Sequence, residues 1–294
     1  MQSLSRDLVV HRPHLRWMSY EPSNVSWWLA WSFTIGSILW VVDGYYLLWP
    51  LGDAKENLIL TSHIAVLGGF VFLVGAYFGV LEAINAEREG NFENASEWVL
   101  ISTSTLLGSV IHHIQLGSLD EDPNKMVSTV STKPEWKWWS LELNTIAKKA
   151  GMTQFAGAVV FFISVVCSLA KRDGTDILIP AEQWILQDVT IWGLQIIGSL
   201  CFLYAAFAFY LELQNQSYCP KIHLLEWHVQ LWNILGAGGF LICAIFGLFT
   251  NYKGVEYCCE TAMEQSSFLG SIAFLVSSVL MVVEIANKHP NAAD

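Results

Sequence analysis

Residues 62–84 of the chain, SHIAVLGGFVFLVGAYFGVLEAI, decide its fold. The stretch contains one carboxylate, that of Glu82, and neither lysine nor arginine. A helix needs about 20 mostly apolar residues to cross the roughly 30 Å hydrocarbon core of a lipid bilayer. The stretch has that length and composition, so it predicts a transmembrane helix.

Five more runs have the same character. With the first, they cover residues 27–48, 62–84, 151–170, 191–210, 227–249 and 266–286. The composition agrees, because 53% of the residues are hydrophobic and 14% are charged, whereas soluble domains carry about 25% charged residues. The predicted fold class is an all-α membrane protein with six transmembrane helices arranged as three tandem helical hairpins.

Polar segments suggest how the chain is divided. We predict an N-terminal segment at 1–26, hairpins at 27–87, 151–216 and 217–288, a long polar loop at 88–150 and a tail at 289–294. Within the loop, the apolar patch WVLISTSTLLGSVI at 98–111 is too short to span a bilayer. It favours an interfacial or a re-entrant helix, and a seventh span is the alternative.

The basic residues indicate an orientation. One side of the predicted bundle carries both termini and holds eleven of them: Arg6, Arg12, Arg16, Arg88, Lys125, Lys133, Lys137, Lys148, Lys149, Lys221 and Lys288. The other side holds Lys55, Lys171, Arg172 and Lys253. Because lysine and arginine are enriched in cytoplasmic loops, both termini are predicted to be cytoplasmic. The three N-x-S sequons, at Asn24, Asn94 and Asn215, lie on that same side and are expected to stay unglycosylated.

All six runs contain glycine, then a small residue, then an aromatic residue four positions after the glycine. The glycines are Gly36, Gly68, Gly157, Gly198, Gly236 and Gly270, and the aromatic residues are Trp40, Phe72, Phe161, Phe202, Phe240 and Phe274. In lipid, close approach through small residues supplies much of the packing between helices, and residues four apart share a helix face. The pattern therefore predicts a helix-packing stripe, with a glycine-lined pore as the alternative.

The second, fourth and sixth runs match further. Each reaches a glutamate fourteen positions after its glycine and an asparagine three positions later: Glu82 and Asn85, Glu212 and Asn215, Glu284 and Asn287. The shared pattern indicates an internal repeat of a two-helix unit. Fourteen residues make nearly four helical turns, so each glutamate shares a face with its glycine. These acids are candidates either for an interfacial structural role or for binding a proton or cation.

Asp43 lies deeper in its run than these glutamates and has no counterpart in the repeat. Ionisable side chains inside membrane helices are often functional. Asp43 is therefore the best single candidate for a functional intramembrane acid, the alternative being a pairing with tyrosine or tryptophan donors.

The histidines and the known catalytic motifs predict no cofactor, metal site or catalytic residue. No histidine pair lies at matching depth in mid-membrane, as a transmembrane haem would require. His112, His113, His223 and His228 could share the cytoplasmic face, where interfacial hydrogen bonding is expected and metal binding is the alternative. A cluster of the first three around a pocket would favour an enzyme. The chain has no phosphate loop, no HExxH and no Gly-x-Ser-x-Gly motif.

The stretch LLEWHVQLWNILGAGGFLICAIFG at 224–247, together with EWKWW at 135–139, resembles a group of uncharacterised fungal multi-pass integral membrane proteins. The repeated Gly-Ser-x-x-Phe-Leu hairpin also resembles the YrhK-like membrane domain. The resemblance implies a multi-pass membrane protein and transfers no catalytic residue. Fungal relatives of this kind accompany biosynthetic gene clusters, which implies an accessory or transport role.

Two classes of function stay open. The leading hypothesis is a transporter or an accessory membrane scaffold; the alternative is a membrane-bound enzyme with a cytoplasm-facing site in a biosynthetic pathway. The net charge of −11 argues against nucleic-acid binding. The expected partners are the lipid bilayer and, as an open alternative, a second copy of the chain or another membrane protein. A polar cavity around the acids would favour transport, and a dry, Phe-packed centre would favour a scaffold.

Overall fold

A computed structural model describes residues 15–86, 136–172, 188–214, 220–250 and 256–288, and these residues are helical with short extended segments. The long helices are α1 (Val25–Leu48), α2 (Ala54–Asn85), α4 (Ile146–Arg172), α6 (Leu194–Gln214), α7 (Leu225–Phe249) and α8 (Glu256–Lys288). A short π-helical turn, η1 (Asp188–Gly193), leads into α6. Each long helix contains a run long and apolar enough to cross a membrane. Within the described residues, the prediction of six helices able to span a membrane is confirmed. The patch at 98–111, where a seventh span is the alternative, lies outside the described residues.

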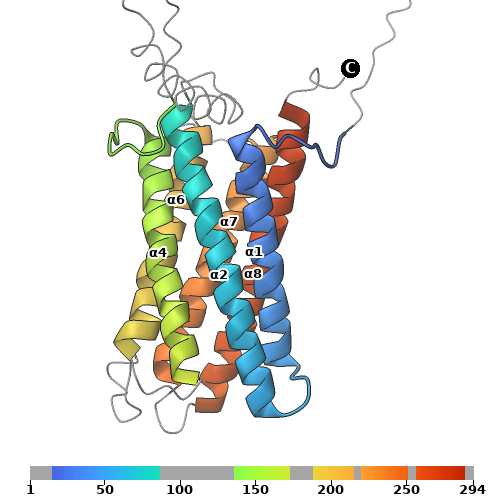
Figure 1. Cartoon of the computed structure of the whole chain (residues 1–294), viewed down its shortest axis with the longest axis vertical. Coiled ribbons are helices and arrows are strands. Elements are labelled where there is room, and N and C mark those ends of the chain that lie inside the picture. The colour runs from blue at the N-terminus through green and yellow to red at the C-terminus, as the bar shows by residue number, and fades with distance from the viewer. Residues whose placement is uncertain (1–14, 87–135, 173–187, 215–219, 251–255, 289–294) are drawn as a thin grey trace, which may run out of the picture.

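The helices form a closed ring of three antiparallel pairs (Figure 1). Within the pairs, α1 packs against α2, α4 against α6 and α7 against α8. Contacts of α2 with α4, of α6 with α7 and of α8 with α1 complete the ring. The helices α1, α4 and α7 begin at the end drawn uppermost in Figure 1, and we call this the upper end.

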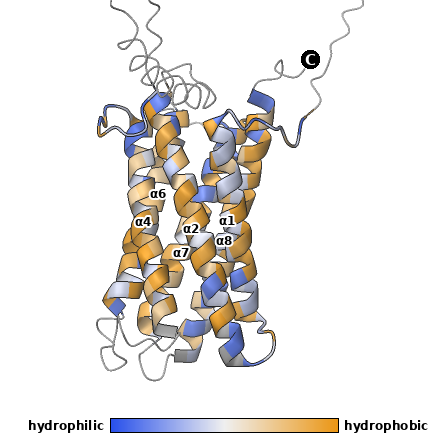
Figure 2. Cartoon of the chain, in the orientation of Figure 1, coloured by the Kyte–Doolittle hydropathy of each residue, from blue (hydrophilic) through white to orange (hydrophobic). Residues whose placement is uncertain are grey.

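The outer surface of the bundle is apolar. Figure 2 shows that hydrophobic residues dominate the middle of the helices and that hydrophilic residues gather toward the ends. Every helix turns large apolar side chains outward, as Ile38, Leu67, Ile163, Leu200, Leu235 and Leu269 illustrate. Helices that are hydrophobic all round are buried in a core or in lipid. Since these side chains face away from the bundle, the outer face is suited to the acyl chains of a bilayer.

The glycines of the repeated pattern lie in close contact with the other helix of their pair. A Cβ atom added to Gly36 would lie 3.1 Å from the Gly68 carbonyl oxygen, and one on Gly270 would lie 3.1 Å from that of Gly236. In the α4–α6 pair, a Cβ on Gly157 would lie 2.6 Å from Cys201 Cβ. A larger side chain at these points would push the paired helices apart.

Two extended segments lie in equivalent positions at the upper end. Residues 16–21, RWMSYE, precede α1, and residues 137–142, KWWSLE, precede α4. The Asn85 amide donates to the Lys137 carbonyl (2.9 Å) and accepts from its N–H (3.0 Å). Asn287 forms the same two bonds with Arg16, at 2.8 and 3.1 Å. Each amide therefore ties the end of one helix pair to the segment that enters the next.

Candidate functional site

The centre of the bundle is closed by the six aromatic residues of the repeated pattern. Those of the first helix in each pair, Trp40, Phe161 and Phe240, contact one another with ring centroids 5.1 to 5.6 Å apart. Those of the second helices, Phe72, Phe202 and Phe274, contact one another at 5.6 to 6.4 Å. The six rings thus form two stacked triangles, one from each set of helices.

The two triangles are joined within each helix pair. The ring centroids of Trp40 and Phe72 are 4.8 Å apart, those of Phe161 and Phe202 are 5.9 Å apart, and those of Phe240 and Phe274 are 5.6 Å apart. We call this arrangement the aromatic prism. Aromatic pairs at such distances add about 0.5–1.5 kcal/mol each beyond their buried area. The prism therefore packs the middle of the bundle tightly and has a threefold arrangement.

Above the prism, at the upper end, lies a cavity of about 400 Å³, which we call the upper cavity. Its lining includes Glu82 of α2, Glu212 of α6 and Glu284 of α8, the three acids of the repeated pattern. Each stands near the upper end of the second helix of its pair. The structure brings these three candidates together because the ring places the second helices at alternate positions around one axis.

Two charged residues of the upper cavity did not emerge from the repeated pattern. Glu226, in the first turn of α7, adds a fourth carboxylate, and Lys288, at the end of α8, adds an ammonium group. Four carboxylates and one ammonium give the described lining a formal charge of −4 + 1 = −3. Glu226 lies in the stretch 224–247 that carries the family resemblance, but it has no counterpart in the other described helices.

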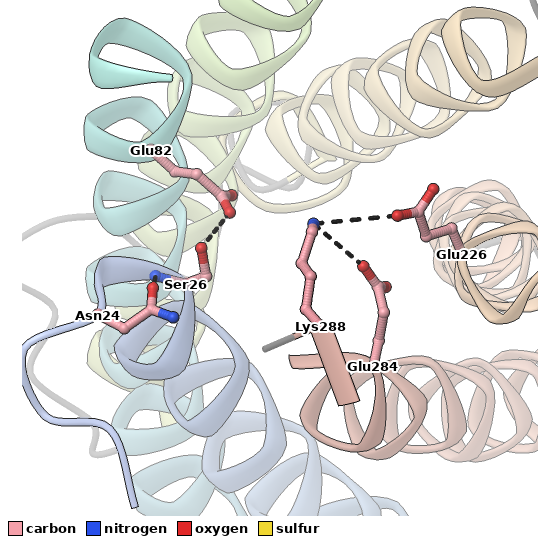
Figure 3. A network of polar contacts seen from close by, with 6 residues as sticks. All are labelled: Asn24, Ser26, Glu82, Glu226, Glu284 and Lys288. Atoms are coloured by element: carbon pink, nitrogen blue, oxygen red, sulfur yellow. Dashed lines mark hydrogen bonds and ion pairs between the residues drawn. The ribbon is translucent and has the colours of Figure 1, made fainter. Parts of the chain in front are cut away.

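The contacts of the acids are drawn in Figure 3. Lys288 Nζ lies 3.5 Å from a carboxylate oxygen of Glu284 and 3.9 Å from one of Glu226, so it bridges α7 and α8. Across the cavity, Glu82 accepts a hydrogen bond from the Ser26 hydroxyl. Ser26 lies in the first turn of α1, whose N-cap Asn24 accepts from the Ser26 N–H at 3.0 Å. Glu82 therefore lies against the N-terminal turn of α1, which is the positive end of that helix dipole.

The deeper wall of the upper cavity is apolar. It is lined by Leu29, Phe33, Phe209 and Met281. Two amide residues, Gln154 and Asn233, line both this cavity and the small space beside the triangle of Phe72, Phe202 and Phe274. A ligand would therefore meet carboxylates near the mouth, hydrocarbon along the wall, and two amides at the floor.

Asp43 is not part of the upper cavity. It is 9% exposed and lines a separate cavity of about 90 Å³ toward the lower end, together with Glu264, Gln195 and Ser267. The prism lies between the two cavities. Of the four candidate acids, three share one site and the fourth belongs to another.

None of the histidines in the described residues lines the upper cavity. His223 is exposed, the His228 ring lies 2.8 Å from the Ile222 carbonyl, and the His63 ring lies 2.8 Å from that of Ile59. His112 and His113 lie outside the described residues. Within the described parts of the chain, no three His, Cys, Asp or Glu side chains are placed to hold a metal ion.

Six long apolar helices, an apolar outer face and polar ends define the chain as a multi-pass integral membrane protein. Comparisons with models of known families, with curated proteins and with solved structures find no match.

Proposed function

We propose that this protein is a membrane carrier for a small molecule that binds in the upper cavity. The observation that carries the proposal is the cavity of about 400 Å³ into which each helix pair contributes one glutamate. Small-molecule sites commonly enclose about 300–1,000 Å³ and combine apolar walls with a few polar groups. In transporters built from repeats, the substrate lies where the repeats meet. We infer that the three helix pairs are such repeats and that the cavity is their common site.

In this proposal, the aromatic prism closes the path between the two ends of the bundle. The upper cavity opens at one end of the bundle, and the cavity around Asp43 lies on the other side of the six rings. A carrier must close one side of its site while the other is open. The arrangement corresponds to a state that is open toward the upper end.

We further propose that the upper end faces the cytoplasm. The support is the distribution of eleven basic residues on the side of the termini against four on the other. The resemblance to fungal membrane proteins leads us to propose, in addition, that the carrier serves a biosynthetic pathway as an accessory protein.

The tight prism favours a second candidate function, that of a membrane scaffold. Rings packed at centroid distances of 4.8 to 6.4 Å fill the centre of the bundle and give it rigidity. A scaffold would need no path through this centre, whereas a carrier must open one. The two candidates therefore differ in a measurable property, which is saturable passage of a solute.

Uptake into proteoliposomes tests the carrier. The probes are benzylamine, benzyl alcohol and benzoate, which share one aromatic body and differ in charge. We expect saturable, protein-dependent uptake of at least one probe. Ala86→Trp should abolish it, because Ala86 is an exposed residue that lines the upper cavity. Ala156→Trp, at an exposed position of α4 outside the cavity lining, is the matched control and should retain uptake. If no probe is taken up, or if both variants take up a probe equally, the carrier proposal fails and the scaffold is favoured.

A further inference from the structure

We propose that the upper cavity selects organic amines with a small apolar body, and that Lys288 is a tethered occupant of the ammonium site. This inference rests on the proposed function, because it names the ligand class of the same cavity. It assigns the polar head of the ligand to Glu226 and Glu284. It also gives the last residue of α8 a role as a competitor that the ligand displaces.

The charge of the cavity determines which sign of charge a ligand should carry. Glu82, Glu212, Glu226 and Glu284 line one space in which Lys288 is the single basic residue among the described lining. The interaction between two charges strengthens where water is excluded from around them. Carboxylates on several sides of one cavity therefore attract a cation and repel an anion.

The position of Lys288 shows where an ammonium group fits. Its Nζ lies between Glu226 and Glu284, 3.9 and 3.5 Å from their nearest carboxylate oxygens (Figure 3). A tight charge-assisted hydrogen bond would be about 2.7–2.9 Å long, so both contacts are loose. The Lys288 side chain is also 57% exposed, and exposed ion pairs contribute little to stability. A free amine can therefore replace this ammonium group at little cost.

The wall below the carboxylates favours a ligand with an apolar body. Leu29, Phe33, Phe209 and Met281 present hydrocarbon between the charged mouth and the amide floor. An inorganic cation would leave this wall unused, and the described residues offer it no cluster of three metal-binding side chains. An amine that carries a ring or a short alkyl chain would satisfy the mouth and the wall together.

Binding of the three benzyl probes to the purified protein, measured by calorimetry, tests the inference. We expect the wild-type protein to bind benzylamine more tightly than benzyl alcohol and to bind benzoate least. Lys288→Gln removes the competing ammonium group and should strengthen benzylamine binding about fivefold. This factor corresponds to about 1 kcal/mol of binding free energy. Lys149 is exposed and lies outside the cavity lining. Lys149→Gln removes the same charge and should leave the affinity for benzylamine unchanged.

A second pair of variants tests the carboxylate. Glu284→Gln should remove the preference for benzylamine over benzyl alcohol. The control is Glu260→Gln, at an exposed position toward the other end of α8, and it should keep this preference. Benzyl alcohol or benzoate binding as tightly as benzylamine would overturn the amine selectivity while leaving the carrier intact. Weaker benzylamine binding by Lys288→Gln would overturn the role of Lys288 as a competitor. Absence of both uptake and binding for every probe would instead overturn the carrier.

Discussion

Two adjacent glycines of α7 provide a sharp test of the packing. A Cβ atom added to Gly239 would lie 2.7 Å from the Gly270 Cα of α8 and 3.0 Å from the Ser266 carbonyl oxygen. A Cβ added to Gly238 would meet nothing within 4 Å. The substitutions Gly239→Ala and Gly238→Ala are therefore chemically identical, lie one residue apart, and differ only in what the new methyl group meets.

The magnitude follows from this geometry. Carbon atoms in contact prefer about 3.5–4.0 Å, so alanine at 239 requires the α8 backbone to retreat by about 1 Å. Overpacking of this kind costs about 1–3 kcal/mol. The gain in helix propensity, about 1 kcal/mol for glycine to alanine, is the same at both positions and cancels in the comparison. We therefore expect Gly239→Ala to be about 1–3 kcal/mol less stable than Gly238→Ala.

The assay is reversible unfolding of the two variants in mixed micelles, followed by circular dichroism. The difference between their free energies of unfolding measures the contact of α7 with α8 at Gly239. Equal free energies, or a more stable Gly239→Ala variant, would refute the view that the two backbones meet at this glycine.

Two further predictions concern the prism and the amide clamps. Phe161→Ala should lower the free energy of unfolding by about 3–5 kcal/mol, because it leaves a cavity among packed rings. Phe207→Ala, at a side chain 46% exposed on the outer face, should cost much less, and similar losses would contradict the packed centre. Asn85→Ala should speed tryptic cleavage after Lys137, because it removes both hydrogen bonds that hold this residue. Asn144→Ala, an exposed position near the same segment, should not do so, and equal cleavage rates would show that the Asn85 clamp does not restrain the chain.

The helices themselves could be predicted from the sequence because a membrane span is a local property. Each span needs only a continuous apolar run of sufficient length, and the described helices contain all six predicted runs. The aromatic residues were likewise recognised from their spacing to glycine. Their meeting as one prism could not be predicted, because it requires each of six helices to turn the same face toward a common axis.

The extended segments before α1 and α4 were missed, although a signal for them exists in the sequence. Both follow the pattern Arg/Lys-Trp-x-Ser-x-Glu, nine residues before the helix that they precede. Apolar runs and their periodicity do not reveal these segments, because they lie outside such runs. The repeated asparagines are visible in the sequence, but their partners are backbone groups, which a sequence pattern does not reveal.

The sequence by itself determined the membrane class and the six long apolar helices of the described residues, because these depend on residues within one helix. Only the tertiary structure decided that Glu82, Glu212 and Glu284 share a cavity with Glu226 and Lys288 while Asp43 lies beyond the prism. Ring closure places helices far apart in the chain around one axis, and side chains from different helices meet only after their relative heights and rotations are set by packing.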